Sequence, residues 1–153
     1  MRKMPELKFL NSKETKEILK LIEEQWGAKL KLDYTLIKNS KNRVFIVNKD
    51  INKIDFSKLR INSVGMYFCD LENEIRLSIE GSQIIGPKAA KNIVEINESQ
   101  VRQWLKGEDL EIKGDYDGFV IIKSNNDFLG TGKYKEGKVL NYVNKGRRVS
   151  YPV

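Results

Sequence analysis

The 153-residue chain contains no histidine and one cysteine, and this scarcity excludes several kinds of site. Histidine is the commonest general base near neutral pH and the commonest metal ligand in proteins. With Cys69 as its single thiol, the chain has no zinc site of the usual ligands and no internal disulfide. We therefore expect no metal centre, and catalysis would have to rely on carboxylate, Lys, Ser or Tyr side chains. This favours a protein that is not an enzyme.

Long hydrophobic runs are also missing. No apolar segment approaches the roughly 20 residues that a membrane-spanning helix requires. The first residues, Met1 to Pro5, are basic but lack the apolar core of a signal peptide. Together with the single cysteine, which fits a reducing compartment, these features predict a cytoplasmic protein.

Positive charge, in contrast, is abundant. The sequence has 28 Lys and Arg against 21 Asp and Glu, a net charge of +7, while 40% of its residues are hydrophobic. Such a chain can bury a core as one large domain or two small ones. The excess charge favours an anionic partner, nucleic acid rather than membrane. The alternative is that the lysines simply keep the protein soluble.

Two amphipathic helices are predicted, at Ser12–Trp26 and Glu98–Lys106. Each follows an asparagine, with Glu or Gln three residues later, which is the pattern of a capping box. Apolar residues recur at helical spacing in both segments, so we expect Trp26 and Trp104 to lie in the core. Cys69 lies in an apolar run and is expected to be a small buried side chain.

The most informative stretch is Gly118 to Val149. Alternating hydrophobic residues separated by Asn, Asp and Gly turns predict three antiparallel strands, at Phe119–Lys123, Phe128–Tyr134 and Lys138–Val143. From Gly118 onward the chain carries seven Lys or Arg and two Asp or Glu. A small β-unit with this much positive charge typically faces phosphates.

Composition changes near Ser78, where we place a boundary between an N-terminal α+β domain (1–78) and a second domain (79–153). The segment Gly81–Lys91 contains two glycines and a proline among small residues. We interpret it as a strand and a turn, followed by a short helix that begins near Pro87. The second domain then reads as a small curled sheet or pseudo-barrel.

The C-terminal part resembles a PUA domain, an RNA-binding module of pseudouridine synthases and archaeosine transglycosylases. The residues that carry this resemblance are Asp117–Ile122, Asp127 and Gly130-Thr131-Gly132. It is similar, further, to the PUA-like tail of Fmu/Sun-type rRNA cytosine-5 methyltransferases, which ends G-x-x-x-N-Y-x-P-K-x-x-R. The matching residues are Gly137, Asn141, Tyr142, Lys145 and Arg148, with Asn144 in place of the proline. The whole chain resembles stand-alone archaeal relatives of that tail, described as ribosome-biogenesis proteins.

This resemblance implies an α+β fold, in which an N-terminal helix and antiparallel sheet precede a PUA-like β pseudo-barrel with short helices. It also implies binding of structured rRNA or tRNA in ribosome biogenesis or RNA modification. The chain lacks the family's proline-preceded catalytic cysteine, because Cys69 follows Phe68. It also lacks a glycine-rich loop followed by a strong helix, so we expect no cofactor. The resemblance therefore implies binding without methyl transfer.

Basic, aromatic and polar side chains in two segments are candidates for RNA contact. They are Lys145, Arg147, Arg148, Tyr142, Asn141, Lys133, Lys135 and Lys138 near the C-terminus, and Ser82, Gln83, Lys88 and Lys91 in the earlier segment. The alternatives are a solvated charged face for the first set and a tight turn for the second. Tyr142 either stacks on an unpaired base or packs on the barrel, and the alternation of residues does not decide between these.

A different class of function also fits the sequence. The N-terminal domain would dock on a separately encoded RNA-modifying enzyme, such as an RNA methyltransferase, or on ribosome-assembly proteins, and RNA contact would be secondary. The acidic residues between Glu108 and Asp117 straddle a helix end and a loop, and we interpret them as surface.

Overall fold

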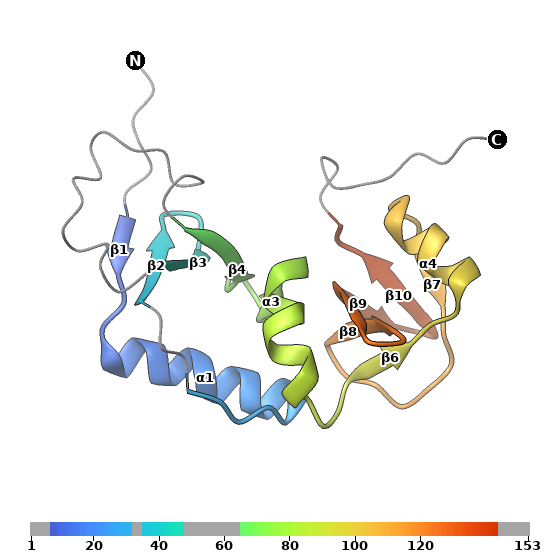
Figure 1. Ribbon diagram of the computed structural model, residues 1–153, viewed down its shortest axis with the longest axis horizontal. Coiled ribbons are helices and arrows are strands. Elements are labelled where there is room, and N and C mark those ends of the chain that lie inside the picture. Colours follow the sequence, from blue (N-terminus) through green and yellow to red (C-terminus); the bar gives the residue numbers. More distant parts are fainter. Residues whose placement is uncertain (1–6, 32–34, 48–64, 144–153) are drawn as a thin grey trace, which may run out of the picture.

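The computed structural model describes residues 7–31, 35–47 and 65–143. These residues form two five-stranded sheets with helices beside and between them, so the predicted α+β class is confirmed. In Figure 1 the N-terminal sheet and helix α1 lie at one end and the C-terminal sheet with α4 at the other. Helix α3 stands between the two sheets.

Helix α1 spans Ser12–Trp26, as predicted. The Asn11 side chain accepts a hydrogen bond from the Glu14 backbone N–H at 2.9 Å, and the Glu14 carboxylate bonds back to the Asn11 N–H. Gly27 ends the helix in the left-handed region, with φ of 69°, which glycine adopts without steric cost. The buried side of α1 consists of Ile18, Ile22 and Trp26.

The N-terminal sheet has the strand order β1-β2-β3-β4-β5, and every neighbouring pair is antiparallel. Its strands are β1 (Leu7–Phe9), β2 (Thr35–Asn39), β3 (Arg43–Val47), β4 (Met66–Asp70) and β5 (Arg76–Leu77). Leu36, Val44 and Phe68 are completely or almost completely buried and share one core cluster with α1. The sheet therefore packs one face on the helix, as an amphipathic helix on a small sheet requires.

The C-terminal sheet has the order β6-β8-β9-β10-β7, in which β6 and β8 are parallel and the other pairs antiparallel. The strands are β6 (Ile93–Glu95), β7 (Leu110–Glu111), β8 (Phe119–Ser124), β9 (Asp127–Lys135) and β10 (Lys138–Asn141). A shift of register between Ile121 and Lys123 interrupts the β8–β9 ladder. Such irregularities bend a sheet, and this one is a curled half-barrel of the PUA-like kind. Helix α4 (Glu98–Leu105) inserts the fully buried Trp104 into its core.

The strand and turn predicted at the start of Gly81–Lys91 are wrong, because this part is helix α3 (Ile79–Ile85). The 3-10 turn η3 (Gly86–Lys88) follows it, at the short helix predicted near Pro87. The glycines serve close packing rather than turn geometry. A Cβ at Gly81 would lie 2.2 Å from the Phe68 carbonyl oxygen, and one at Gly86 would lie 2.2 Å from the Phe128 ring. Helix α3 thus lies directly against β4 and reaches the C-terminal sheet.

The two sheets are joined through buried polar and apolar contacts. Trp26 Nε1 donates to the Phe119 carbonyl at 3.0 Å, and Thr131 Oγ1 donates to the Leu77 carbonyl at 2.8 Å. One core cluster contains α1 and N-terminal sheet residues together with Phe119 and Phe128 of the C-terminal sheet. The division at residue 78 remains a prediction, and the contacts across it hold the two sheets in a fixed relation.

Candidate nucleic-acid interface

One face of the β9–β10 hairpin gathers lysines beside an aromatic ring. In the antiparallel register Lys138 lies opposite Lys135, and Leu140 lies opposite Lys133. Directly opposite residues point to the same side of a sheet, and so do residues two apart in a strand. Tyr142 follows Leu140 at this spacing and lines one pocket with Lys133, Lys135 and Leu140. We call Lys133, Lys135, Lys138, Leu140 and Tyr142 the lysine face.

Tyr142 lies partly exposed at the surface of the C-terminal sheet, and its ring also packs on the barrel. Its neighbours Val139 and Val143 are buried in the barrel core, whereas Tyr142 is 44% exposed. Its ring stands edge-on to Phe119, with 5.1 Å between the ring centroids. The Arg76 guanidinium lies over the ring, 4.9 Å from its centroid. Tyr142 therefore presents its ring at the surface, next to a cation.

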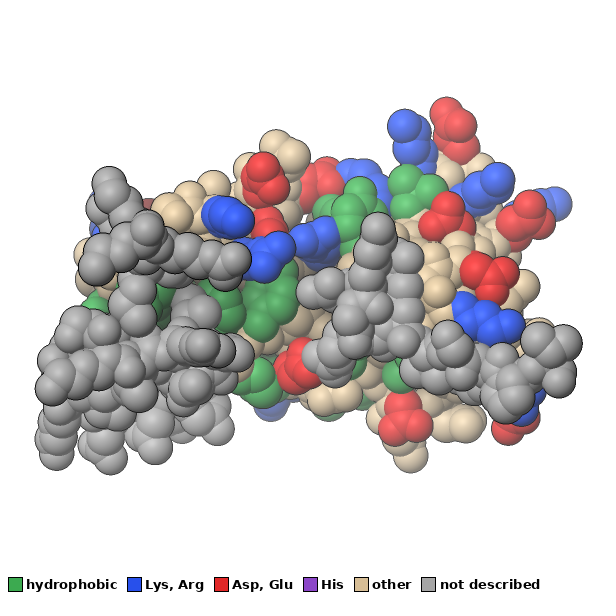
Figure 2. Space-filling view, turned by 90° about the horizontal axis from the view of Figure 1, so that it is seen from above, with side chains coloured by type: hydrophobic (Ala, Val, Ile, Leu, Met, Phe, Trp, Pro, Cys, Tyr) green, Lys and Arg blue, Asp and Glu red, His purple; other side chains and the backbone are tan. Residues whose placement is uncertain are grey.

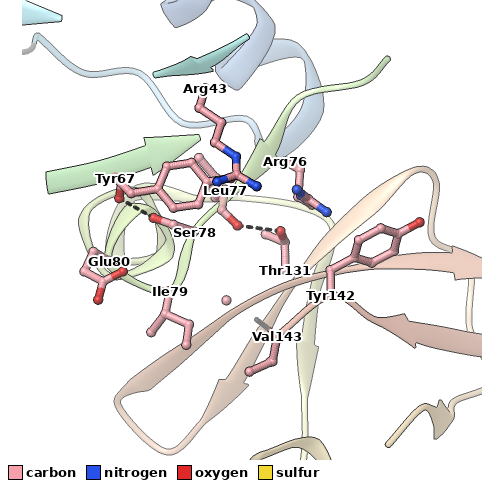
Figure 3. A pocket seen from close by; sticks show the side chains of 11 residues that line it. Arg43, Tyr67, Arg76, Leu77, Ser78, Ile79, Glu80, Thr131, Tyr142 and Val143 are labelled. Carbon is pink, nitrogen blue, oxygen red and sulfur yellow. Dashed lines mark hydrogen bonds between the residues drawn. The ribbon is translucent and has the colours of Figure 1, made fainter. Parts of the chain in front are cut away.

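A pocket of about 340 Å³ opens where the two sheets meet. Figure 3 shows it bounded by the guanidinium groups of two arginines, by two tyrosines and by apolar side chains near the start of α3 and after β10. We call it the inter-sheet pocket. Its lining includes Arg43, Tyr67, Arg76, Ile79, Tyr142 and Val143. It has the size and mixed lining that are typical of small-ligand sites.

The arginines of this pocket are held from behind by one carboxylate. Asp70 is only 6% exposed, and its Oδ2 lies 3.4 Å from Arg76 Nη2 and 4.0 Å from Arg43 Nε. The Arg43 and Arg76 side chains remain 48% and 27% exposed, so each keeps donors available on the pocket side. Asp70 thus forms a hydrogen-bonded ion pair with Arg76 and a longer ionic contact with Arg43, and it restricts the position of Arg76 the more strongly.

Tyr67 completes the cluster on the side of the N-terminal sheet. The Arg43 guanidinium lies 5.7 Å from the centroid of its ring. Burial raises the pKa of the Tyr67 hydroxyl above its ordinary value, and the positive charge of Arg76 opposes this shift. The hydroxyl therefore stays protonated at neutral pH and is able to donate a hydrogen bond.

A second pocket lies on the other side of Arg76 and Tyr142, with a different charge balance. Lys133, Lys135 and Arg76 contribute to its lining, but Asp70, Glu72 and Glu74 do as well. Lys133 Nζ is paired with the Glu74 carboxylate. In the described part of the chain neither Lys135 nor Lys138 forms an ion pair. Figure 2 likewise shows basic and acidic side chains intermixed, so location rather than net charge distinguishes the candidate site.

Two of the predicted contact residues have structural partners inside the protein. The Asn141 amide donates to the Trp104 carbonyl at 2.8 Å and to the Glu108 carbonyl at 3.0 Å. Ser82 is fully buried, donates to the Ile79 carbonyl and accepts from the Gly130 N–H at 2.8 Å. Asn141 thus ties β10 to the end of α4, and Ser82 ties α3 to β9. Neither side chain belongs to the inter-sheet pocket.

The other predicted residues fall into separate groups. Gln83 and Lys88 are exposed on α3 and η3, and Lys91 lines a third pocket with Glu24, Asp115 and Asp117. The start of α3, not the Gly81–Lys91 segment, provides the wall opposite Tyr142. Lys145, Arg147 and Arg148 lie outside the described residues, and along the chain they follow Val143, which lines the inter-sheet pocket.

Arg43, Tyr67 and Arg76 were missed by sequence reasoning. Each lies in or next to a short strand of the N-terminal sheet, and no motif marks them. Arg43 and Arg76 are each the first residue of a short strand, before apolar residues, and this placement is a weak signal. What brings them together is the β3–β4–β5 order of the sheet, in which Asp70 is the cross-strand partner of both arginines.

Other kinds of site receive no support from the described residues. Across 7–31, 35–47 and 65–143, no three His, Cys, Asp or Glu side chains are placed to hold a metal ion. Within the same ranges no helix is long and apolar enough to span a membrane. Cys69 is buried, as predicted, and burial raises the pKa of its thiol well above the ordinary value.

Comparison with known proteins supports the fold that the geometry shows. Residues 91–149 match a family model described as the methyltransferase RsmF PUA domain. A search of curated proteins found no match. Among solved structures, a conserved PUA domain protein from Thermoplasma acidophilum aligns with a TM-score of 0.63 and 14% sequence identity, over 93% of this chain and 97% of that one.

These matches define the chain as an α+β protein with a PUA-like fold. Its C-terminal part resembles the PUA domain of the RsmF methyltransferase, so the resemblance predicted for roughly residues 80–149 is confirmed.

Proposed function

We propose that the protein binds RNA through a continuous surface made of the lysine face and the inter-sheet pocket. The observation that carries the proposal is the stacking of Arg76 on the exposed ring of Tyr142, at the point where these two areas meet. Cationic side chains supply contacts to phosphates, and exposed aromatic rings supply stacking platforms for bases. The PUA-like fold supports the same class of partner.

The lysine face also contains a repulsion between like charges, which binding of a polyanion such as RNA would reduce. Lys135 and Lys138 lie directly opposite each other in the β9–β10 hairpin, without a carboxylate partner in the described residues. Like charges in this position destabilise a sheet. An RNA phosphate between them would offset the repulsion, which supports a binding role over a purely solvating one.

The proposed role is binding without catalysis, in the cytoplasm, on structured rRNA or tRNA during ribosome biogenesis or RNA modification. The domain family that matches residues 91–149 is named for a methyltransferase, which supports a place beside RNA modification. Lys145, Arg147 and Arg148 would extend the basic surface beyond Val143 and are part of the proposal.

Crosslinking in cells, followed by sequencing of the attached RNA, tests this function. We expect enrichment of rRNA or tRNA, and weaker recovery for a variant with Lys145, Arg147 and Arg148 changed to Ala. Equal recovery for this variant would remove the three residues from the site. If the purified protein instead carries a second protein in stoichiometric amount and no RNA above background, the proposal is contradicted. That result would favour the alternative function, in which the N-terminal domain docks on a separate RNA-modifying enzyme.

A further inference from the structure

We infer that the inter-sheet pocket takes one unpaired nucleotide, whose base lies among Tyr67, Tyr142 and the apolar floor and whose phosphate meets Arg43 and Arg76. The inference rests on the proposed RNA-binding function and specifies the ligand of one site within it. It adds the N-terminal sheet to the binding surface, since Arg43, Tyr67 and Arg76 all belong to that part of the chain.

The chemistry of the lining matches a nucleotide part by part. Figure 3 shows the two guanidinium groups close together at one side, with Ile79 and Val143 away from them. A planar guanidinium offers paired donors in the geometry that a phosphate accepts. Tyr67 and Tyr142 offer aromatic surface to a base, and Ile79 and Val143 offer apolar contact to its edge.

The arginines are preorganised for this role. Asp70 hydrogen-bonds Arg76 and lies 4.0 Å from Arg43 Nε, and it is not itself a lining residue of the pocket. The pocket therefore presents the positive charges of Arg43 and Arg76, while the compensating carboxylate stays behind them.

The ligand must be unpaired because the pocket is a recess between two sheets. A base within a duplex is stacked on its neighbours and paired along one edge, so its faces are not available to tyrosine rings. A base from a loop, a bulge or a chain end can be turned outward to enter. The neighbouring pocket is a poorer candidate, because Glu72 and Glu74 balance its lysines.

The test measures backbone chemical shifts while the full chain is titrated with a nucleoside 5′-monophosphate, the corresponding nucleoside, and inorganic phosphate. We expect the monophosphate to shift residues around Arg43, Tyr67, Arg76 and Tyr142, and to bind more tightly than either component alone. Inorganic phosphate binding as tightly as the nucleotide would overturn the inference, because the base would then contribute nothing.

Variants add a second readout that uses a single-stranded hexanucleotide and a blunt RNA duplex. Tyr142→Ala is expected to weaken hexanucleotide binding about fivefold or more, because it removes the stacking of one base. Arg43→Gln is expected to weaken it as well, because it removes a charged contact to the phosphate. Duplex binding should change much less for Tyr142→Ala. The matched controls are Phe9→Ala, another exposed aromatic side chain, and Arg102→Gln on α4.

The outcomes separate the two proposals. RNA that binds the wild type but loses no affinity in Tyr142→Ala and Arg43→Gln, relative to their controls, overturns the nucleotide site and leaves the general RNA-binding function standing. Absence of binding to every RNA tested overturns both.

Discussion

At the residue scale, Cys69 shows how burial sets chemistry. It is fully buried in strand β4 of the N-terminal sheet, and burial raises the pKa of its thiol above the ordinary value of 9.0. A raised pKa contributes stability that is fully present below the ordinary value and is lost as the pH rises above it. We expect the free energy of unfolding to fall above about pH 9, and to fall less in Cys69→Ala, as measured by urea denaturation at several pH values. Burial also raises the pKa of Tyr67, so its ionisation lowers the stability at high pH as well. A Tyr67→Phe variant separates the contribution of Tyr67 from that of Cys69.

Asn141 carries a second prediction at the residue scale. Its amide donates to two backbone carbonyls and its oxygen accepts from the Val143 N–H at 2.7 Å. Removing such a side chain leaves the carbonyls without these donors, at a cost of about 1–3 kcal/mol. Asn141→Ala should therefore lower the urea midpoint while leaving RNA affinity of the folded protein unchanged. A loss of RNA affinity at full stability would instead return Asn141 to the binding surface.

At the element scale, helix α3 depends on the absence of a side chain at Gly81. In an exposed helix, Gly→Ala is stabilising by roughly 0.5–1 kcal/mol. Here a Cβ would lie 2.2 Å from the Phe68 carbonyl oxygen, and overpacking of this kind costs about 1–3 kcal/mol. We expect Gly81→Ala to destabilise the protein in thermal and urea unfolding. The control is Gln83→Ala on the exposed side of α3, and stabilisation by Gly81→Ala would contradict the packing described here.

The same helix marks the limit of what could be predicted. Local signals were sufficient for α1, where the capping box, the apolar spacing and Gly27 agree, and for the β8–β10 meander, where turns separate alternating strands. Gly81 and Gly86 suggested a turn because the reason for their small size is a neighbour far along the chain, Phe68 or Phe128. The lysine face could be predicted because its residues belong to a single hairpin, whose register follows from the local sequence. Arg43 and Arg76 become neighbours only through the order of the strands in the sheet, which the local sequence pattern does not encode.

At the scale of the whole molecule, the junction of the sheets determines how the protein unfolds. Trp26 lies in the core cluster that spans both sheets, and Trp104 lies in the cluster of the C-terminal sheet. Because Phe119, Ile121 and Phe128 belong to the first cluster, loss of one sheet exposes apolar surface on the other. We therefore expect one cooperative unfolding transition. The Trp26→Phe and Trp104→Phe variants each keep one tryptophan. Within each variant, the fluorescence of that tryptophan and the circular dichroism should give the same unfolding midpoint. Separate midpoints within either variant would show that the two parts unfold independently.

The central claim is that the lysine face binds RNA phosphates, and the salt dependence of RNA affinity tests it most directly. The measurement compares the wild type with a variant in which Lys133, Lys135 and Lys138 are Ala. The control removes the same charge from α1 by changing Lys13, Lys16 and Lys20, all exposed, to Ala. Each phosphate contact adds about 0.7 to the slope of log affinity against log salt for single strands. Because Lys133 is paired with Glu74, the variant loses two or three phosphate contacts, and we predict a slope reduced by about 1.4–2.1 for it and little changed for the control. Equal slopes for the two variants would contradict the account.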